Sequence, residues 1–158
     1  MNALILCVGK LREKWQAQGC EEYLKRLTRY GKYELISVPD EPEPEKPSPA
    51  LDKRVMDKEG KALLKYIKPG DFVAALCVEG RQMGSTELAS WMRLKENAGI
   101  RPVFVIGGSL GLSSDVVSHA DERLSFSKFT FPHGLMRVIL LEQLYRGERI
   151  NAGERYHK

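Results

Sequence analysis

The stretch Leu124–Arg146 holds the residue types that could form a small-molecule site. It reads LSFSKFTFPHGLMRVILLEQLYR, with a polar and aromatic turn at Ser127–Pro132, His133 at the start of a helical pattern and Arg137 one turn further on. Aromatic rings pack against the face of a nucleotide base, while hydroxyl and backbone groups bind its edge. We interpret the turn as a candidate binding site. The alternative is a hydrophobic corner that closes the core, in which His133 makes only a structural hydrogen bond.

A glycine-rich loop is the second candidate site. Gly107, Gly108 and Gly111 follow the apolar run Pro102–Ile106, a context that allows close approach of the backbone to a nucleotide. The dinucleotide fingerprint would need glycine where Ile106 stands, and no Gly-Lys-Ser/Thr phosphate loop is present. The loop therefore disfavours NAD and ATP as ligands. A plain tight turn is the alternative.

Apolar runs alternate with helical patterns along the whole chain. We expect strands at Ala3–Val8, Tyr33–Val38, Phe72–Val78, Pro102–Ile106 and Leu124–Phe126. Helices are expected at residues 11–30, 51–67, 85–98 and 133–147, with a short helix capped by Ser113 or Ser114. This order predicts an α/β fold with a mostly parallel sheet and helices on both faces, in a single domain over residues 1–158.

Such sheets bind ligands at the carboxyl ends of their strands. In this chain that rule predicts a site formed by the loops after Leu76, Ile106 and Phe126. The last helix is apolar nearly all round, so we expect it to be fully buried or to form an oligomer interface.

The segment Pro39–Pro49 interrupts these patterns. It contains five of the eight prolines, which cannot donate regularly to a helix or a sheet, so we expect a surface loop within one domain. Residues 40–46 carry a net charge of −3, which leaves +7 on the rest of a chain whose total is +4. A basic body with a separate acidic loop suits a polyanionic partner such as nucleic acid, although the charge also serves solubility.

The composition bears on the cellular compartment, on membrane association and on metal binding. No apolar run approaches the roughly 18–20 residues of a membrane span, and the first residues lack the basic region of an export signal. Cys7, Cys20 and Cys77 form no Cys-x-x-Cys pair, and no histidine clusters with them. We expect a cytoplasmic protein without membrane association and without a metal site.

Several ordered motifs resemble one protein family. These are VGKL at residues 8–11, VPD at 38–40, DKEG at 57–60, VIGGSLG at 105–111, LSFSKFTFPH at 124–133, LEQLYR at 141–146 and the terminal YHK. Together they resemble the RlmH family, bacterial 23S rRNA pseudouridine-N3 methyltransferases of the SPOUT superfamily. The resemblance implies a deep C-terminal trefoil knot (the α/β-knot), which is a rare exception to the rule against knots. It also implies S-adenosylmethionine as cofactor and a homodimer through the helix after His133.

The resemblance further implies roles for individual residues. The cofactor-binding residues would be Leu76, Gly107, Gly108, Phe126, Ser127, Lys128, Phe129, Thr130 and Phe131. The catalytic, substrate-facing set would be His133, Arg137, Tyr156, His157 and Lys158. Two positions depart from the expected pattern. Leu110 is apolar, so we assign it no substrate contact, and Gly147 should loosen the end of the last helix.

The expected reaction is transfer of a methyl group from S-adenosylmethionine to N3 of a pseudouridine in 23S rRNA, on the assembled ribosome. His157, His133 or a water would accept the N3 proton, and Arg137 would stabilise negative charge on a neighbouring carbonyl oxygen. Two other functions stay open at this point. One is a nucleotide-binding hydrolase or phosphotransferase on a flavodoxin-like sheet, and the other is a non-enzymatic ribosome-associated factor.

Overall fold

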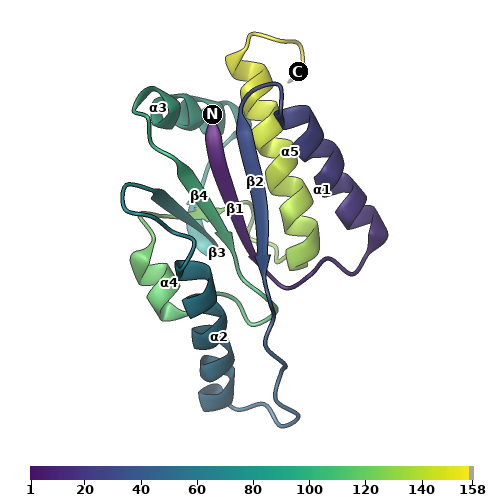
Figure 1. Ribbon diagram of the computed structural model, residues 1–158, viewed down its shortest axis with the longest axis vertical. Helices are drawn as coiled ribbons and strands as arrows, with labels where there is room; N and C mark the ends of the chain where they lie inside the picture. Colours follow the sequence, from purple (N-terminus) through teal and green to yellow (C-terminus); the bar gives the residue numbers. More distant parts are fainter. Residues whose placement is uncertain (157–158) are drawn as a thin grey trace.

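A five-stranded parallel sheet forms the centre of the protein (Figure 1). The computed structural model describes residues 1–156. Its strands pair in the order β2-β1-β4-β3-β5, and every pairing is parallel. The strands are β1 (Asn2–Val8), β2 (Lys32–Val38), β3 (Phe72–Gln82), β4 (Pro102–Ile106) and β5 (Glu122–Ser125).

Helices cover both faces of the sheet. One face, with Ala3, Ile5 and Cys7 of β1, packs against α1, α3 and α5, and the other face, with Leu4 and Leu6, packs against α2 and α4. The alternation follows from the period of two in a strand, and burial on both faces explains why β1 is apolar throughout. The helices are α1 (Lys14–Leu27), α2 (Pro49–Leu64), α3 (Ser85–Asn97), α4 (Ser114–His119) and α5 (His133–Asn151).

The architecture confirms the predicted order of elements and the parallel sheet, while several boundaries differ. Helix α2 begins at Pro49, because Ser48 caps it by accepting a hydrogen bond from the Leu51 N–H and proline is well suited to the first turn. The large side chain of Trp15 on α1 is 54% exposed. The trefoil knot implied by the family resemblance stays a prediction.

Strand β3 is longer than expected because it contains a bulge. Leu124 of β5 pairs first with Leu76 and again with Arg81, so the intervening residues leave the ladder and β3 then resumes. Gly80 permits this close return, since a Cβ atom there would lie 2.6 Å from the carbonyl carbon of Leu124. The predicted loop at residues 79–84 is therefore mostly strand.

Helix α5 continues to Asn151, so the predicted helix end at Gly147 is wrong. Gly147 lies buried against α3, where an added Cβ would lie 2.5 Å from the sulfur of Met92. The glycine lets the two helices approach closely, and that packing offsets its low helix propensity. Gly153, with φ of 69°, follows the helix end.

Among the described residues, no helix is long and apolar enough to cross a membrane.

Replacing Gly80 with alanine should lower the free energy of unfolding by about 1–3 kcal/mol, because the new methyl group would press on the backbone of β5. Gly84→Ala is the matched control, since no atom lies within 4 Å of a Cβ there, and it should cost less than about 1 kcal/mol. Urea unfolding followed by circular dichroism measures both. Equal losses in the two variants would show that the bulge does not require glycine.

Candidate active site

A cavity of about 360 Å³ opens at the carboxyl side of β3, β4 and β5. Its walls come from the three regions that the sequence indicated, namely the chain after Leu76, the glycine loop after Ile106 and the turn after Phe126. The prediction that these loops meet is confirmed. A cavity of this size falls within the range of small-molecule sites.

The cavity brings together most of the predicted cofactor residues. Lys128 is the exception, because it is exposed and does not line the cavity. The predicted residues that do line it are Leu76, Gly107, Gly108, Phe126, Ser127, Phe129, Thr130 and Phe131.

Other lining residues were missed by the sequence reasoning. Leu110, to which we assigned no substrate contact, is part of the wall. Most of the others adjoin predicted residues in the chain, as Met136 adjoins Arg137, and that adjacency was the available signal. The missed residues are Cys77, Val78, Ile106, Ser109, Leu110, Leu112, Leu124, Ser125 and Met136, whereas Gly111 belongs to the predicted glycine-rich loop.

The glycine loop presents backbone to the cavity. Gly111 donates its N–H to the carbonyl of Gly108 at 3.1 Å, and its φ of 89° favours glycine. A Cβ at Gly107 would lie 2.6 Å from the carbonyl carbon of Gly111. The loop is therefore a tight turn that also lines the cavity. The two interpretations of the sequence, a tight turn and a ligand-binding loop, are compatible.

Serine hydroxyl groups shape the aromatic turn. The hydroxyl of Ser125 donates to the carbonyl of Ser127 at 3.0 Å, and the hydroxyl of Ser127 accepts the N–H of Phe129 at 3.0 Å. Phe129 lines the cavity, and it is also 80% exposed. A ring this exposed beside a cavity is available to pack against a bound ligand.

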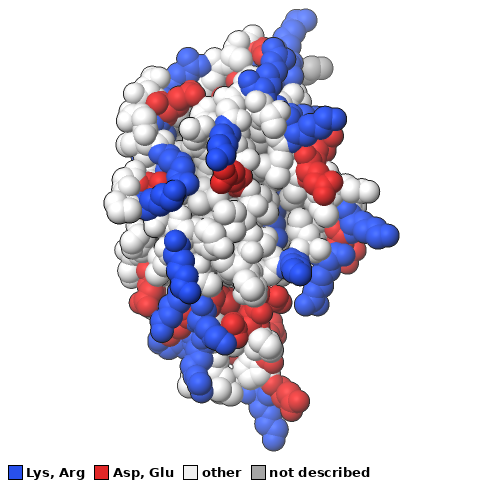
Figure 2. All heavy atoms as spheres, viewed as in Figure 1, with Lys and Arg blue, Asp and Glu red and all other residues white. Residues whose placement is uncertain are grey.

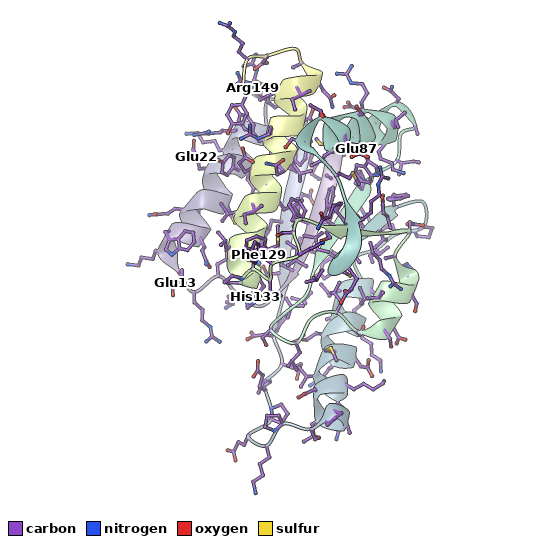
Figure 3. All side chains as sticks on the ribbon, turned by 180° about the vertical axis from the view of Figure 1, so that it is seen from behind. Glu13, Glu22, Glu87, Phe129, His133 and Arg149 are labelled. Carbon is purple, nitrogen blue, oxygen red and sulfur yellow. The ribbon has the colours of Figure 1, made fainter. Side chains whose placement is uncertain are left out.

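His133 lies at the rim of the cavity as the first residue of α5 (Figure 3). Its partial burial lowers the pKa of His133, and the nearby charges of Arg137 and Arg12 lower it further, while Asp40 acts in the opposite direction. The lowered pKa favours the neutral imidazole, which is the form that can accept a proton.

Arg137 is fully buried and does not line the cavity. Its guanidinium donates to the carbonyls of Val8 at 2.6 Å and Gly9 at 2.9 Å, and to the hydroxyl of Ser37 at 3.2 Å. Arg137 therefore attaches the first turns of α5 to the ends of β1 and β2. These contacts hold the start of α5 in place, so within the chain Arg137 acts as a positioning residue.

Tyr156 lies away from the cavity. Its ring packs against Tyr145 at 5.1 Å between centroids, and its hydroxyl donates to Glu142 at 3.3 Å. Burial raises the pKa of Tyr156 to about 12. Even Glu142 is nine residues beyond His133, a rise of about 14 Å along the helix. His157 and Lys158 lie outside the described residues.

The segment before Tyr156 is held at the far end of α5. Arg149 pairs with Glu154 at 2.6 Å, and Tyr30 donates to the same carboxylate at 2.9 Å. Figure 3 shows His133 and Arg149 at opposite ends of α5. Among the described residues, the structure thus leaves Tyr156 well separated from His133 within one chain.

Comparison with known proteins identifies the family. A family model described as "Predicted SPOUT methyltransferase" matches residues 1–157. The chain belongs to the SPOUT methyltransferase family. Two curated relatives of this SPOUT methyltransferase, from Alkaliphilus oremlandii and Bacillus cereus, are both named "Ribosomal RNA large subunit methyltransferase H". Each is 52% identical to it over the full length of both chains. The predicted resemblance is confirmed, and it argues against a phosphotransferase or a non-enzymatic factor.

Solved structures share the fold of this SPOUT methyltransferase. A probable methyltransferase from Bordetella pertussis matches with a TM-score of 0.59 and 14% identity, covering 93% of this chain and 94% of that one. A probable methylase family protein from Haemophilus influenzae matches with a TM-score of 0.58 and 12% identity, covering 99% of this chain and 70% of that one. At these identities the likeness concerns the fold alone.

A second hollow of about 310 Å³ adjoins the first. The two share wall residues of β5 and the aromatic turn, and the second extends to Ile139 and Gln143 of α5. Among residues 1–156, the SPOUT methyltransferase has no group of three or more His, Cys, Asp or Glu side chains that could hold a metal ion.

In this SPOUT methyltransferase, Arg137→Met should lower the free energy of unfolding by about 2–4 kcal/mol, because it leaves two buried carbonyl groups without a donor. Arg146→Met is the control on the same helix, where the partly exposed pair with Glu142 should cost less than about 1 kcal/mol. Chemical denaturation compares the two. Similar small losses would contradict the bridging role.

Proposed function

We propose that the chain transfers a methyl group from S-adenosylmethionine to N3 of a pseudouridine in 23S rRNA, on the assembled ribosome and in the cytoplasm. The supporting observation is the glycine-walled cavity at the strand ends, in a chain whose full-length relatives at 52% identity are named rRNA methyltransferases. The three cysteines of the chain are free, which suits a reducing compartment.

The cavity fits the cofactor in size and in the chemistry of its walls. Apolar and aromatic side chains of Leu76, Phe126, Phe129 and Phe131 would hold the flat base, and the backbone of the glycine loop would approach its polar edges. When bound, S-adenosylmethionine supplies a methyl group on a positively charged sulfur, so the transfer needs no metal. The chain's main contribution is to hold the two reactants in position.

His133 is the described residue best placed to accept the N3 proton. It lines the cavity, and its lowered pKa favours the neutral imidazole. Arg137 acts through His133, because its hydrogen bonds to β1 fix the first turn of α5. Arg137 would also place positive charge behind the reacting base, although its guanidinium does not reach the cavity surface.

The charge of the chain suits an RNA substrate. Figure 2 shows Lys and Arg side chains spread over the visible face, in a chain with net charge +4. Lys128 and Phe129 add an exposed cation and an exposed ring at the aromatic turn. Cations that bind phosphate and rings that stack on bases are the common elements of RNA binding.

We propose a homodimer that pairs through α5. Arg137, Leu140, Leu141 and Leu144 of this helix are fully buried within the chain. Other apolar residues are only half-buried, and a second copy would cover them; these are Leu135, Val138, Ile139 and Ile150.

The dimer would let the tail of one subunit complete the site of the other. Within its own chain Tyr156 packs along α5, well separated from His133. The second hollow reaches Ile139 and Gln143 on α5, beside the proposed dimer surface. A partner's tail entering there would bring Tyr156, His157 and Lys158 to the cavity.

The reaction is tested with labelled S-adenosylmethionine and ribosomes from cells that lack this protein, alongside ribosomes that lack pseudouridine. We expect label on a single pseudouridine of 23S rRNA in the first sample and little or none in the second. Label that is equal in both samples would contradict pseudouridine as the target. Cofactor binding without label on either would redirect the search to other RNAs.

The shared site is tested by mixing two inactive chains. One carries Gly107→Ala, whose added methyl group would press on the backbone of Gly111 and distort the glycine loop, and the other ends at Arg155. A mixed dimer has one intact cavity facing one intact tail, so it should carry roughly half of the wild-type activity. An equal mixture, in which about half of the dimers are mixed, should recover about a quarter. Each variant alone should be inactive. If the tail instead acted on its own chain, the mixed dimer would hold no complete site and would stay inactive.

A further inference from the structure

Glu59 presents an unused carboxylate oxygen to the wall of the cavity. This residue of α2 is 5% exposed, and its Oε1 atom accepts the backbone N–H of Glu41 at 3.1 Å. The Oε2 atom is buried and has no hydrogen-bond partner among the described residues. A Cβ built on Gly108 would lie 3.3 Å from Oε2, so the oxygen lies directly against a glycine that lines the cavity.

The surroundings of Glu59 are acidic. The β2–α2 loop carries Asp40, Glu41 and Glu43, and Glu43 accepts a hydrogen bond from the hydroxyl of the wall residue Ser109. Figure 2 shows carboxylates gathered where this loop meets the sheet. Burial raises the pKa of Glu59, and these acidic neighbours raise it further.

The nearby cations are paired with other groups. Lys58 pairs with Glu41 at 2.9 Å and Arg12 with Asp40 at 3.7 Å, both at the surface. Within residues 1–156, no salt bridge to Glu59 is formed. The buried guanidinium of Arg137 bonds to the carbonyls of Val8 and Gly9 and not to Glu59. The glycine loop therefore has behind it a carboxylate that pairs with no cation of the described residues.

Holding the β2–α2 loop requires an acceptor at position 59 but not a charge. A glutamine would accept the N–H of Glu41 equally well, without the cost of burying a carboxylate that makes one hydrogen bond. A positively charged ligand in the adjacent cavity would offset that cost. The methyl donor carries a positive sulfur, whereas the product left after transfer has a neutral sulfur.

We propose that Glu59 makes the cavity selective for the charged methyl donor over its neutral product. The inference rests on the proposed function, which places S-adenosylmethionine in this cavity. Loss of the positive charge on transfer removes the attraction to Glu59, so the product is released more readily. Glu59 is thus a specificity-determining residue that acts across the backbone of Gly108.

The experiment measures dissociation constants of S-adenosylmethionine and S-adenosylhomocysteine by calorimetry on the full chain. Glu59→Gln should weaken binding of the charged donor on the order of tenfold and change binding of the neutral product less than about twofold. Glu45→Gln is the control, because it removes an exposed charge from the same loop and should leave both constants unchanged.

Glu59→Asp changes the length of the side chain but keeps its charge, so it separates the effect of charge from the effect of shape. It also provides a test if the Glu59→Gln variant fails to fold. It keeps the carboxylate, so the ratio of the two dissociation constants should stay near that of the wild type even if both ligands bind more weakly. Equal weakening of both ligands in Glu59→Gln, or a collapsed ratio in Glu59→Asp, would overturn the proposal. Absence of binding to the wild type would overturn the proposed function as well.

Discussion

The buried guanidinium of Arg137 is the contact on which the candidate site depends. Its hydrogen bonds to the carbonyls of Val8 and Gly9 join residues nearly 130 positions apart, at the point where β1 ends. Arginine stays charged at all relevant pH values, so burying it requires acceptors that are fixed in place. Backbone carbonyls at a strand end meet that need. Because the first turn of α5 is attached there, His133 is held at the rim of the cavity.

The cavity itself is built largely from backbone. Gly80 and Gly107 let backbone segments approach more closely than a side chain would allow, and Gly108 lies tightly against Val8 and Glu59. Side chains then give this space its chemical character. Aromatic residues face a ligand from one side, His133 offers a neutral imidazole, and Glu59 lies behind the glycine loop. The roles that we propose for binding, proton acceptance and charge selectivity thus fall on different elements.

Helix α5 connects two regions with different roles. Its first turn belongs to the cavity, and its last turns hold the tail through Tyr145, Arg149 and Glu154. A rigid helix keeps these regions apart, so a single chain cannot bring Tyr156 to His133 while the tail stays docked. In the homodimer that we propose, the half-buried apolar side of α5 would form the interface, and a partner's tail would supply the residues that lie away from His133.

The sequence by itself determined the parallel α/β sheet, the order of its elements and the three loops that meet at the cavity. These follow from local patterns, since strands buried on both faces are continuously apolar and parallel strands place their carboxyl ends together. Only the tertiary structure decided that Arg137 bonds to β1, that Glu59 lies beside Gly108 and that Tyr156 lies away from His133. The first two bring together residues far apart in the chain, and no local pattern of residue types specifies such a partner.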